Sequence, residues 1–238
     1  MLLSYKKLVT ASSSLPGHEP ALAVNENIRD YWSAASGAKG EWLQVDLGGV
    51  CTAYAVQINF AEEGCDQYGR EGEPLRHRYV LESSLDGHAW SQIVDKRSNE
   101  EDVPHDYVEF AAPLRARYFR IINEHMPAAG KFAISGLRLF GKGGGSAPAS
   151  VSTVDAALIP DDLLSASLTW KPIAGAMGYN VRWGIAPDKL YDSWLVYERT
   201  ELTLRALNKG SKYWMRVDAF NENGVTTGTP IMVKPTAR

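Results

Sequence analysis

Apolar and polar residues alternate in short segments throughout the sequence, and this period of two constrains the possible folds more than any other feature. Leu43, Val45 and Leu47, for example, would lie on one face of an extended segment, with Gln44 and Asp46 on the other. A helix would instead need apolar residues three or four positions apart, and no segment shows that spacing convincingly. The chain is therefore predicted to be built from β-strands.

The predicted strands are short, and turn-forming residues separate them. Asp86-Gly87 supplies a hairpin turn between two strands, and Tyr54, Val56 and Ile58 are expected to share the core face of another. The expected strands cover residues 5–14, 42–47, 53–60, 78–84, 90–94, 107–110, 117–123 and 134–140, and then 167–170, 178–183, 195–199, 202–206, 212–220 and 231–233. This pattern is typical of an all-β sandwich fold.

A change in composition divides the chain. The sequence KGGGSAPAS at 142–150 is rich in Gly, Ala, Pro and Ser, as is typical of a short flexible linker. A length of 238 residues also favours two domains. We expect a first domain over 1–142, a linker over 143–150 and a second domain over 151–238.

Charge and hydropathy exclude two classes of function. The net charge is −3, and the 25 Lys and Arg are scattered, so the sequence carries no electrostatic footprint for nucleic acid. No apolar run approaches the ~18 residues of a membrane span. The first residues, MLLSYKK, do not have the pattern of a signal peptide, and the chain reads as a fragment of a larger protein.

The two cysteines are expected to be thiols. Cys51 and Cys65 flank the predicted strand 53–60, and a strand that rises ~3.3 Å per residue carries its ends far apart. A disulfide needs Cα atoms within about 7 Å. A bridge would form only if the following loop folded straight back.

No catalytic apparatus is predicted. Glycoside hydrolysis usually needs two placed carboxyl groups, one of them with a raised pKa. The available carboxylates lie in hydrophilic loops beside like charges, where they are expected to be solvated; they are Glu62, Glu63, Glu71, Glu73 and the acidic run 100–102. The sequence also lacks G-x-S-x-G, H-E-x-x-H, C-x-x-C and P-loop motifs. By itself the chain is predicted not to be an enzyme.

Four ordered motifs carry a resemblance to a known family. They are ALAVNENIRDYWSAASGAKGEWLQVDLG at 21–48, YVLESSLDGHAWSQI at 79–93, ARYFRIIN at 116–123 and ISGLRLFG at 134–141. This set resembles the discoidin, or coagulation factor 5/8 type C, domain over essentially residues 4–141. The resemblance implies a jelly-roll β-sandwich, which in bacteria serves as a carbohydrate-binding module attached to glycoside hydrolases.

The second part resembles a fibronectin type III domain. The motif is LNKGSKYWMRVDAFNENG at 207–224. The resemblance implies an immunoglobulin-like sandwich in which the hydroxyl of Tyr213 binds back to the preceding loop and Trp170 is buried. The two parts together are similar to the C-terminal accessory region of bacterial glycoside hydrolases, of the type attached to family 43 xylosidases and arabinosidases.

The resemblance also raises the question of calcium. Carbohydrate-binding discoidin modules commonly hold a structural calcium ion in the loop before the strand-entry tryptophan. Here Asn25 stands where an Asp is expected, Tyr31 lies near the Thr position, and Gly136 stands where a Glu would be. Calcium prefers six to eight oxygen ligands, several of them anionic, and Asp30 alone could supply a charge. No cofactor is predicted, and calcium occupancy is left open.

Loop residues are the predicted ligand contacts. Trp32, Trp42 and Trp90 occupy core positions in the family, so they are not assigned to a ligand. Discoidin topology gathers the loops 25–31, 61–77, 99–105 and 124–131 at one end of the sandwich. The candidate ligand-binding residues in these loops are Arg29, Asp30, Tyr31, Tyr68, Arg70, Arg76, His77 and His125. An alternative is that these side chains only solvate the loops.

The predicted function is that of a non-catalytic accessory region. It would hold or orient a secreted bacterial glycoside hydrolase on plant or host polysaccharide, in the extracellular space or the periplasm, with the catalytic domain of the parent enzyme as a second partner. One alternative is a purely structural module that docks on the catalytic domain through the loop 61–77. A protein-adhesion module is less favoured, because animal discoidin domains usually carry a disulfide between their ends.

Overall fold

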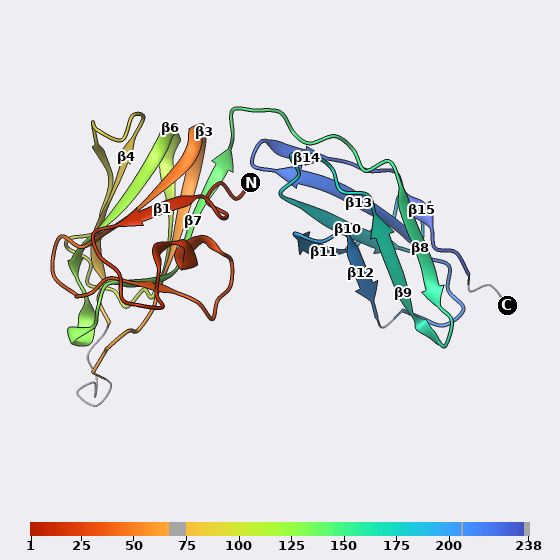
Figure 1. Ribbon diagram of the computed structural model, residues 1–238, viewed down its shortest axis with the longest axis horizontal. Helices are drawn as coiled ribbons and strands as arrows, with labels where there is room; N and C mark the ends of the chain where they lie inside the picture. Colours follow the sequence, from red (N-terminus) through yellow and green to blue (C-terminus); the bar gives the residue numbers. More distant parts are fainter. Residues whose placement is uncertain (67–74, 206, 236–238) are drawn as a thin grey trace. The chain divides into compact units, whose positions relative to one another are not determined.

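A computed structural model describes residues 1–66, 75–205 and 207–235. The chain separates into two compact units, Met1–Gly144 and Gly145–Arg238, and each is a β-sandwich (Figure 1). The prediction of an all-β sandwich fold is therefore confirmed. Within the described residues, no helix has the length and apolar character that a membrane span requires.

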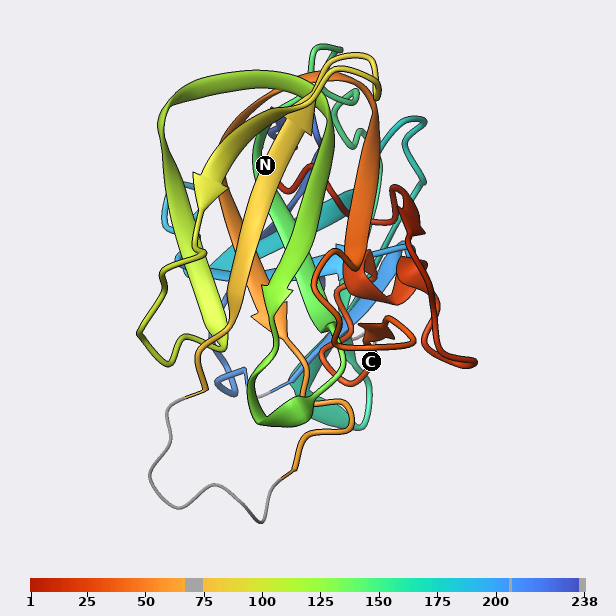
Figure 2. The same cartoon turned by 90° about the vertical axis from the view of Figure 1, so that its left-hand side faces the viewer.

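The strands of the first unit form one continuous hydrogen-bonded system in the order β2-β7-β3-β6-β4-β5, with β1 paired to β3. Figure 2 shows these strands curving around the core, with connecting loops gathered at each end. The strands are β1 (Leu8–Ala11), β2 (Trp32–Ser33), β3 (Trp42–Phe60), β4 (Arg78–Ser84), β5 (Ser91–Asp95), β6 (His105–His125) and β7 (Ala133–Lys142), and the 3₁₀ turns are η1 (Pro20–Val24) and η2 (Pro127–Ala129).

Two strands are much longer than the sequence pattern predicts. The segments 42–47 and 53–60 are parts of the single strand β3, and 107–110 and 117–123 are parts of β6. Gly48 and Pro113 do not end these strands, because β3 and β6 pair with each other along most of their length. Irregular residues are instead accommodated by shifts in the register of the β3–β6 pairing, one of them between Asp46 and Cys51.

One of these shifts corrects the predicted orientation of Tyr54. The register changes between Ala53 and Ala55, and both alanines are buried. Tyr54 is 47% exposed, although Val56 and Ile58 face the core as expected. A bulge of this kind inserts one residue, which turns the side chains before it to the opposite face.

The core of the first unit confirms the alternation of β3. Leu43 and Val45 are fully buried and pack in the same apolar cluster as Phe119 and Ile121 of β6. Trp32 is also fully buried, and its indole N–H donates to the Oγ of Ser14 at 3.0 Å. Removing these apolar side chains from water is the main stabilising contribution to the unit.

Two of the three tryptophans assigned to the core are partly exposed. Trp42 alternates out of phase with Leu43 and therefore lies on the outer side of β3. Trp90 lies beside the Arg120 guanidinium, whose carbon is 4.0 Å from the ring centroid, and its N–H donates to the carbonyl of Gly87. Of these three tryptophans, only Trp32 has the buried environment that the family resemblance implies.

The second unit consists of two facing sheets. One has the order β11-β10-β13-β14, with β15 paired to β13, and the other has the order β12-β9-β8. The strands are β8 (Val154–Ile159), β9 (Asp162–Trp170), β10 (Gly178–Gly184), β11 (Asp192–Tyr197), β12 (Glu201–Leu204), β13 (Trp214–Asn221), β14 (Gly224–Thr226) and β15 (Ile231–Met232). β8 and β14 were not predicted, and Ala206, the predicted end of β12, lies outside the described residues.

Two expectations for this unit are confirmed. Trp170 is buried and meets the ring of Tyr179 edge to face, with centroids 5.3 Å apart. The backbone N–H of Asn208 donates to the hydroxyl of Tyr213 at 3.0 Å, so this tyrosine does bind back to the preceding loop. In the first unit, no disulfide joins Cys51 to Cys65, both of which are described.

Candidate functional site

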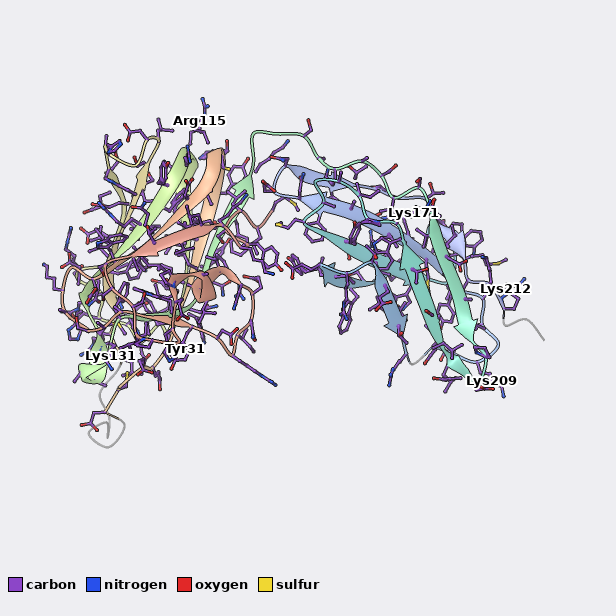
Figure 3. All side chains as sticks on the ribbon, viewed as in Figure 1. Tyr31, Arg115, Lys131, Lys171, Lys209 and Lys212 are labelled. Atoms are coloured by element: carbon purple, nitrogen blue, oxygen red, sulfur yellow. The ribbon has the colours of Figure 1, made fainter. Side chains whose placement is uncertain are left out.

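Three loops of the first unit meet at one end of its sandwich. The backbone N–H of Lys131 donates to the carbonyl of Glu63 at 2.8 Å, and that of Asp66 donates to the carbonyl of Ala128 at 2.9 Å. The loop before β2 joins them through Tyr31. Figure 3 shows Tyr31 and Lys131 at this end and Arg115 at the opposite end of the same unit.

Glu63 is the centre of the side chains gathered there. The Tyr31 hydroxyl donates to its Oε2 at 2.7 Å, and the Lys131 Nζ is 3.8 Å from its Oε1. The ring of Tyr31 lies against His18, with centroids 4.2 Å apart. We call Tyr31, Glu63, Lys131 and His18 the Glu63 cluster. The hydrogen bond to Glu63, together with burial, raises the pKa of the Tyr31 hydroxyl, which therefore stays protonated.

The backbone beside this cluster is closely packed and strained. Ala128 and Ala129 both have positive φ, 54° and 52°, a region that L-residues other than Gly, Asn and Asp rarely adopt. At Gly130 an added Cβ would come within 2.5 Å of the Cys65 Sγ. The turn after η2 therefore fits tightly onto the loop that carries Glu63.

A second group of side chains comes from the ends of β4 and the loop before β6. The Arg76 Nε donates to the carbonyl of Glu100 at 3.1 Å, and the Arg78 Nη2 pairs with the Glu100 Oε1 at 2.5 Å. The backbone N–H of Leu75 donates to Asp102. Arg76 is thus already held by the neighbouring loop, which limits its freedom to meet a ligand.

His77 is not at the surface of the loop end, which corrects its placement among the candidate contacts. It is 4% exposed, and its ring stacks on Phe60 with centroids 4.1 Å apart. Its carbonyl accepts a hydrogen bond from the Asn99 Nδ2. His77 lies one position before β4, and its side chain is buried on the same side as that of Tyr79, whose ring also lies against Phe60.

Three further candidates, Arg29, Asp30 and His125, stand outside the Glu63 cluster. Arg29 and His125 are exposed, while the Asp30 carboxylate accepts hydrogen bonds from two asparagine side chains of its own loop. Tyr68 and Arg70 lie outside the described residues, as do Glu71 and Glu73. Among the candidate residues that the structure describes, Tyr31 alone belongs to the Glu63 cluster.

Three members of this cluster were not among the predicted ligand contacts. Glu63 was interpreted as a solvated carboxylate, and His18 and Lys131 were not singled out. Tyr31 and Glu63 are 32 positions apart, so no local spacing brings them together. The only signal was topological, namely that the loops 25–31, 61–77 and 124–131 were expected at one end.

Comparison with known proteins decides the family. Residues 9–135, more than half of the chain, match the F5/8 type C domain. The chain belongs to the F5/8 type C domain family. In this F5/8 type C domain the matched range includes Tyr31, Glu63 and Lys131. No curated protein matches the sequence of the chain.

Solved structures are similar to the F5/8 type C unit. Chitosan-binding module 1 from a chitosanase/glucanase of Paenibacillus sp. IK-5 has a TM-score of 0.50 and 21% identity, and the match covers 59% of this chain and 99% of that chain. Chitosan-binding module 2 of that enzyme, in complex with chitotriose, has a TM-score of 0.49 and 21% identity, over 58% of this chain and 99% of its own. CpGH89CBM32-4 from Clostridium perfringens, in complex with GlcNAc-alpha-1,4-galactose, has a TM-score of 0.46 and 16% identity, over 58% and 91%.

Proposed function

We propose that the F5/8 type C unit binds carbohydrate at the Glu63 cluster. The observation that supports this most directly is the convergence of an aromatic ring, a carboxylate and an ammonium group from three loops that are distant in sequence. Sugar sites combine a ring that stacks on the C–H face of the sugar with polar groups that fix its hydroxyls. The Glu63 cluster contains each of these groups.

The hydrogen-bonding capacity of the cluster is not exhausted. A carboxylate accepts about four hydrogen bonds, and an ammonium group donates three. Glu63 receives one from Tyr31, and Lys131 is at ion-pair distance rather than at short hydrogen-bond distance. Hydroxyl groups of a sugar can therefore donate to Glu63 and accept from Lys131 without breaking the Tyr31 contact.

The larger assignment is part of the proposal. The chain acts as a non-catalytic accessory region of a secreted bacterial glycoside hydrolase, of the family 43 xylosidase or arabinosidase type, in the extracellular space or the periplasm. Its second unit is a fibronectin type III domain. This is supported by its two sheets, β11-β10-β13-β14 and β12-β9-β8, and by the contact between Tyr213 and Asn208.

One observation favours docking on another domain, through the second unit instead of the loop 61–77. β11 is at the edge of its sheet, and on this strand Trp194 and Leu195 are 54% and 56% exposed. Large apolar side chains on an edge strand are unusual on a monomeric surface and are suited to contact with another domain. Docking on a catalytic domain of the parent enzyme is therefore the second candidate function.

A titration with oligosaccharides, followed by NMR, tests carbohydrate binding. The panel contains xylan, arabinan and chitosan oligosaccharides and host-type galactosides at millimolar concentration, since a Kd of about 10⁻⁴–10⁻³ M is expected for a site of a few contacts. Shifts should be centred on Tyr31, Glu63 and Lys131. Tyr31→Ala and Glu63→Gln should each abolish them.

The matched control is Tyr54→Ala. Tyr54 is also an exposed tyrosine, 47% accessible, but it lies on β3 next to the Ala53–Leu114 pair, toward the Arg115 end of the unit. Its removal should leave binding unchanged. Binding that survives Tyr31→Ala would contradict the Glu63 cluster as the carbohydrate site, and no binding to any oligosaccharide of the panel would favour the docking function instead.

A further inference from the structure

The loop between η1 and β2 is closed by its own side chains. The Oδ1 of Asn25 accepts the backbone N–H of Asn27 at 2.8 Å, and the Oδ1 of Asn27 accepts the backbone N–H of Arg29 at 3.2 Å. These bonds fix the orientation of both amides, because the oxygen of each is directed at the backbone. The nitrogen of each amide is therefore directed away from these backbone groups and can donate to another acceptor.

Both amide nitrogens donate to the same oxygen. The Asn25 Nδ2 is 2.9 Å from the Oδ2 of Asp30, and the Asn27 Nδ2 is 2.8 Å from it. Asp30 is the carboxylate around which this loop folds, and it is already compensated by N–H donors. The positive ends of two amides thus lie against the Oδ2 of Asp30, where a bound cation would meet that oxygen.

A third contact brings a full positive charge to the same loop. The Arg138 Nε of β7 donates to the Oε1 of Glu26 at 2.8 Å, and both side chains are partly buried, with 19% and 26% exposed. Glu26 has a φ of 62°, a conformation that glycine adopts more easily. A contact that holds a non-glycine residue in this region offsets part of the backbone cost.

Gly136 of β7 stands where carbohydrate-binding discoidin modules are expected to have a Glu. The space around it has no room for such a side chain. At Gly136 an added Cβ would be 2.8 Å from the Asn59 Nδ2, and the Asn59 Oδ1 lies 3.2 Å from the His105 Nδ1. A glutamate at this position would displace Asn59 from that contact. The chain therefore lacks an anionic ligand from this strand.

These donors do not fit a calcium ion. Calcium requires six to eight oxygens, several of them anionic. Here both asparagine oxygens are bonded to the backbone, Asp30 accepts two N–H groups, and Glu26 is paired with Arg138. Nowhere in the described ranges do three or more His, Cys, Asp or Glu side chains gather in a way that could hold a metal ion.

We infer that Arg138 and the amides of Asn25 and Asn27 replace calcium in this loop, so that the loop before Tyr31 is held without a metal ion. Arg138 acts as a positioning residue, because it touches Glu26 and not the Glu63 cluster. The inference does not depend on carbohydrate binding, and it is tested without any sugar.

The first test measures calcium binding to the whole chain. Calorimetry and thermal melting are carried out in EDTA and in calcium at about 10 mM, well above the Kd of about 10⁻⁴–10⁻³ M that is usual for extracellular calcium modules. We expect no heat of binding and the same melting midpoint, to within about 1 °C. A rise of several degrees in calcium, which a bound ion would produce, would overturn the inference.

The second test uses hydrogen exchange to measure how far the Arg138–Glu26 ion pair orders the loop. Arg138→Met and the milder Glu26→Gln each remove the ion pair. The amides of Asn27 and Arg29 should then exchange about two- to fivefold faster, the factor expected for a partly exposed ion pair. The matched control is Arg117→Met, which removes another arginine–carboxylate pair of the same unit. Unchanged exchange in Glu26→Gln, or equal acceleration in the control, would contradict the role of Arg138.

The third test changes the loop so that it could bind calcium. The combined change Asn25→Asp, Asn27→Asp and Arg138→Gln supplies carboxylate oxygens and removes the fixed cation. This variant should gain a calcium-dependent melting midpoint that the natural chain lacks. A variant that stays insensitive to calcium would show that these donors are not what excludes the ion, and would count against the inference.

Discussion

Arg117 of β6 and Asp46 of β3 form a two-pronged ion pair across neighbouring strands. The arginine Nε and Nη2 donate to the two carboxylate oxygens, each at 2.7 Å. The parallel geometry matches the planar fork of a guanidinium to a carboxylate. The pair lies where β3 leaves its regular register, between Asp46 and Cys51, and it therefore ties the two long strands together at that irregularity.

The stability of the first unit should depend on pH through Asp46. The hydrogen bonds from Arg117 lower the pKa of Asp46. A carboxyl group whose pKa is lowered by folding stabilises the folded state above its unfolded pKa of about 3.9. This contribution is lost as the pH falls through the lower, folded-state pKa. Thermal melting between about pH 5 and pH 2 should fall less steeply for Asp46→Asn than for the natural chain, and parallel curves would contradict the assignment.

Tyr213→Phe should destabilise the second unit only modestly. The change removes the acceptor of the Asn208 N–H. That bond lies at an exposed site, so water can replace the lost partner, and we expect a loss of about 0.5–1.5 kcal/mol rather than the larger cost of a buried unsatisfied group. Urea unfolding gives the difference. Tyr191→Phe is the control, because Tyr191 is 75% exposed and should tolerate the same loss of a hydroxyl.

Ala129→Gly should stabilise the first unit. Ala129 is exposed and has a φ of 52°, and this region costs a non-glycine residue roughly 1–2 kcal/mol. Glycine relieves that strain but has a more flexible unfolded chain, so a net gain of up to about 1 kcal/mol is expected. The melting midpoint measures it. Ala112→Gly on the exposed part of β6 should have the opposite sign, since glycine weakens a strand.

The sequence predicts most of the strands because alternation is a local property of the chain. It could not predict the bulge that turns Tyr54 outward, because that shift depends on how β3 pairs with β6 and β7. The candidate site shows the same limit. Tyr31 was found from its loop, but Glu63 and Lys131 reach it through contacts between segments that are distant in sequence. The sequence alone does not show which charged loop residues will be paired, because their partners are set by tertiary contacts.

Gly130→Ala should be more damaging than its position in a loop implies. Gly130 is buried between Cys65 and Pro127, and an added Cβ would come within 2.5 Å of the Cys65 Sγ and 3.2 Å of the Pro127 carbonyl. Overpacking of this kind costs about 1–3 kcal/mol. Because Lys131 follows directly and Cys65 belongs to the loop of Glu63, the Glu63 cluster should be displaced as well.

The double variant Gly130→Ala, Cys65→Ala separates the steric cause from a general loss of glycine. Removal of the Sγ opens the space that the new methyl group needs, so urea unfolding should show part of the lost stability restored relative to Gly130→Ala with Cys65 intact. The NMR signal of the Trp32 indole N–H, which donates to Ser14 and lies next to Tyr31 in the chain, reports on the loop in both variants. If Cys65→Ala gave no recovery, the clash would instead have to involve the Pro127 carbonyl, and the contact with the Glu63 loop would not be the reason for the glycine.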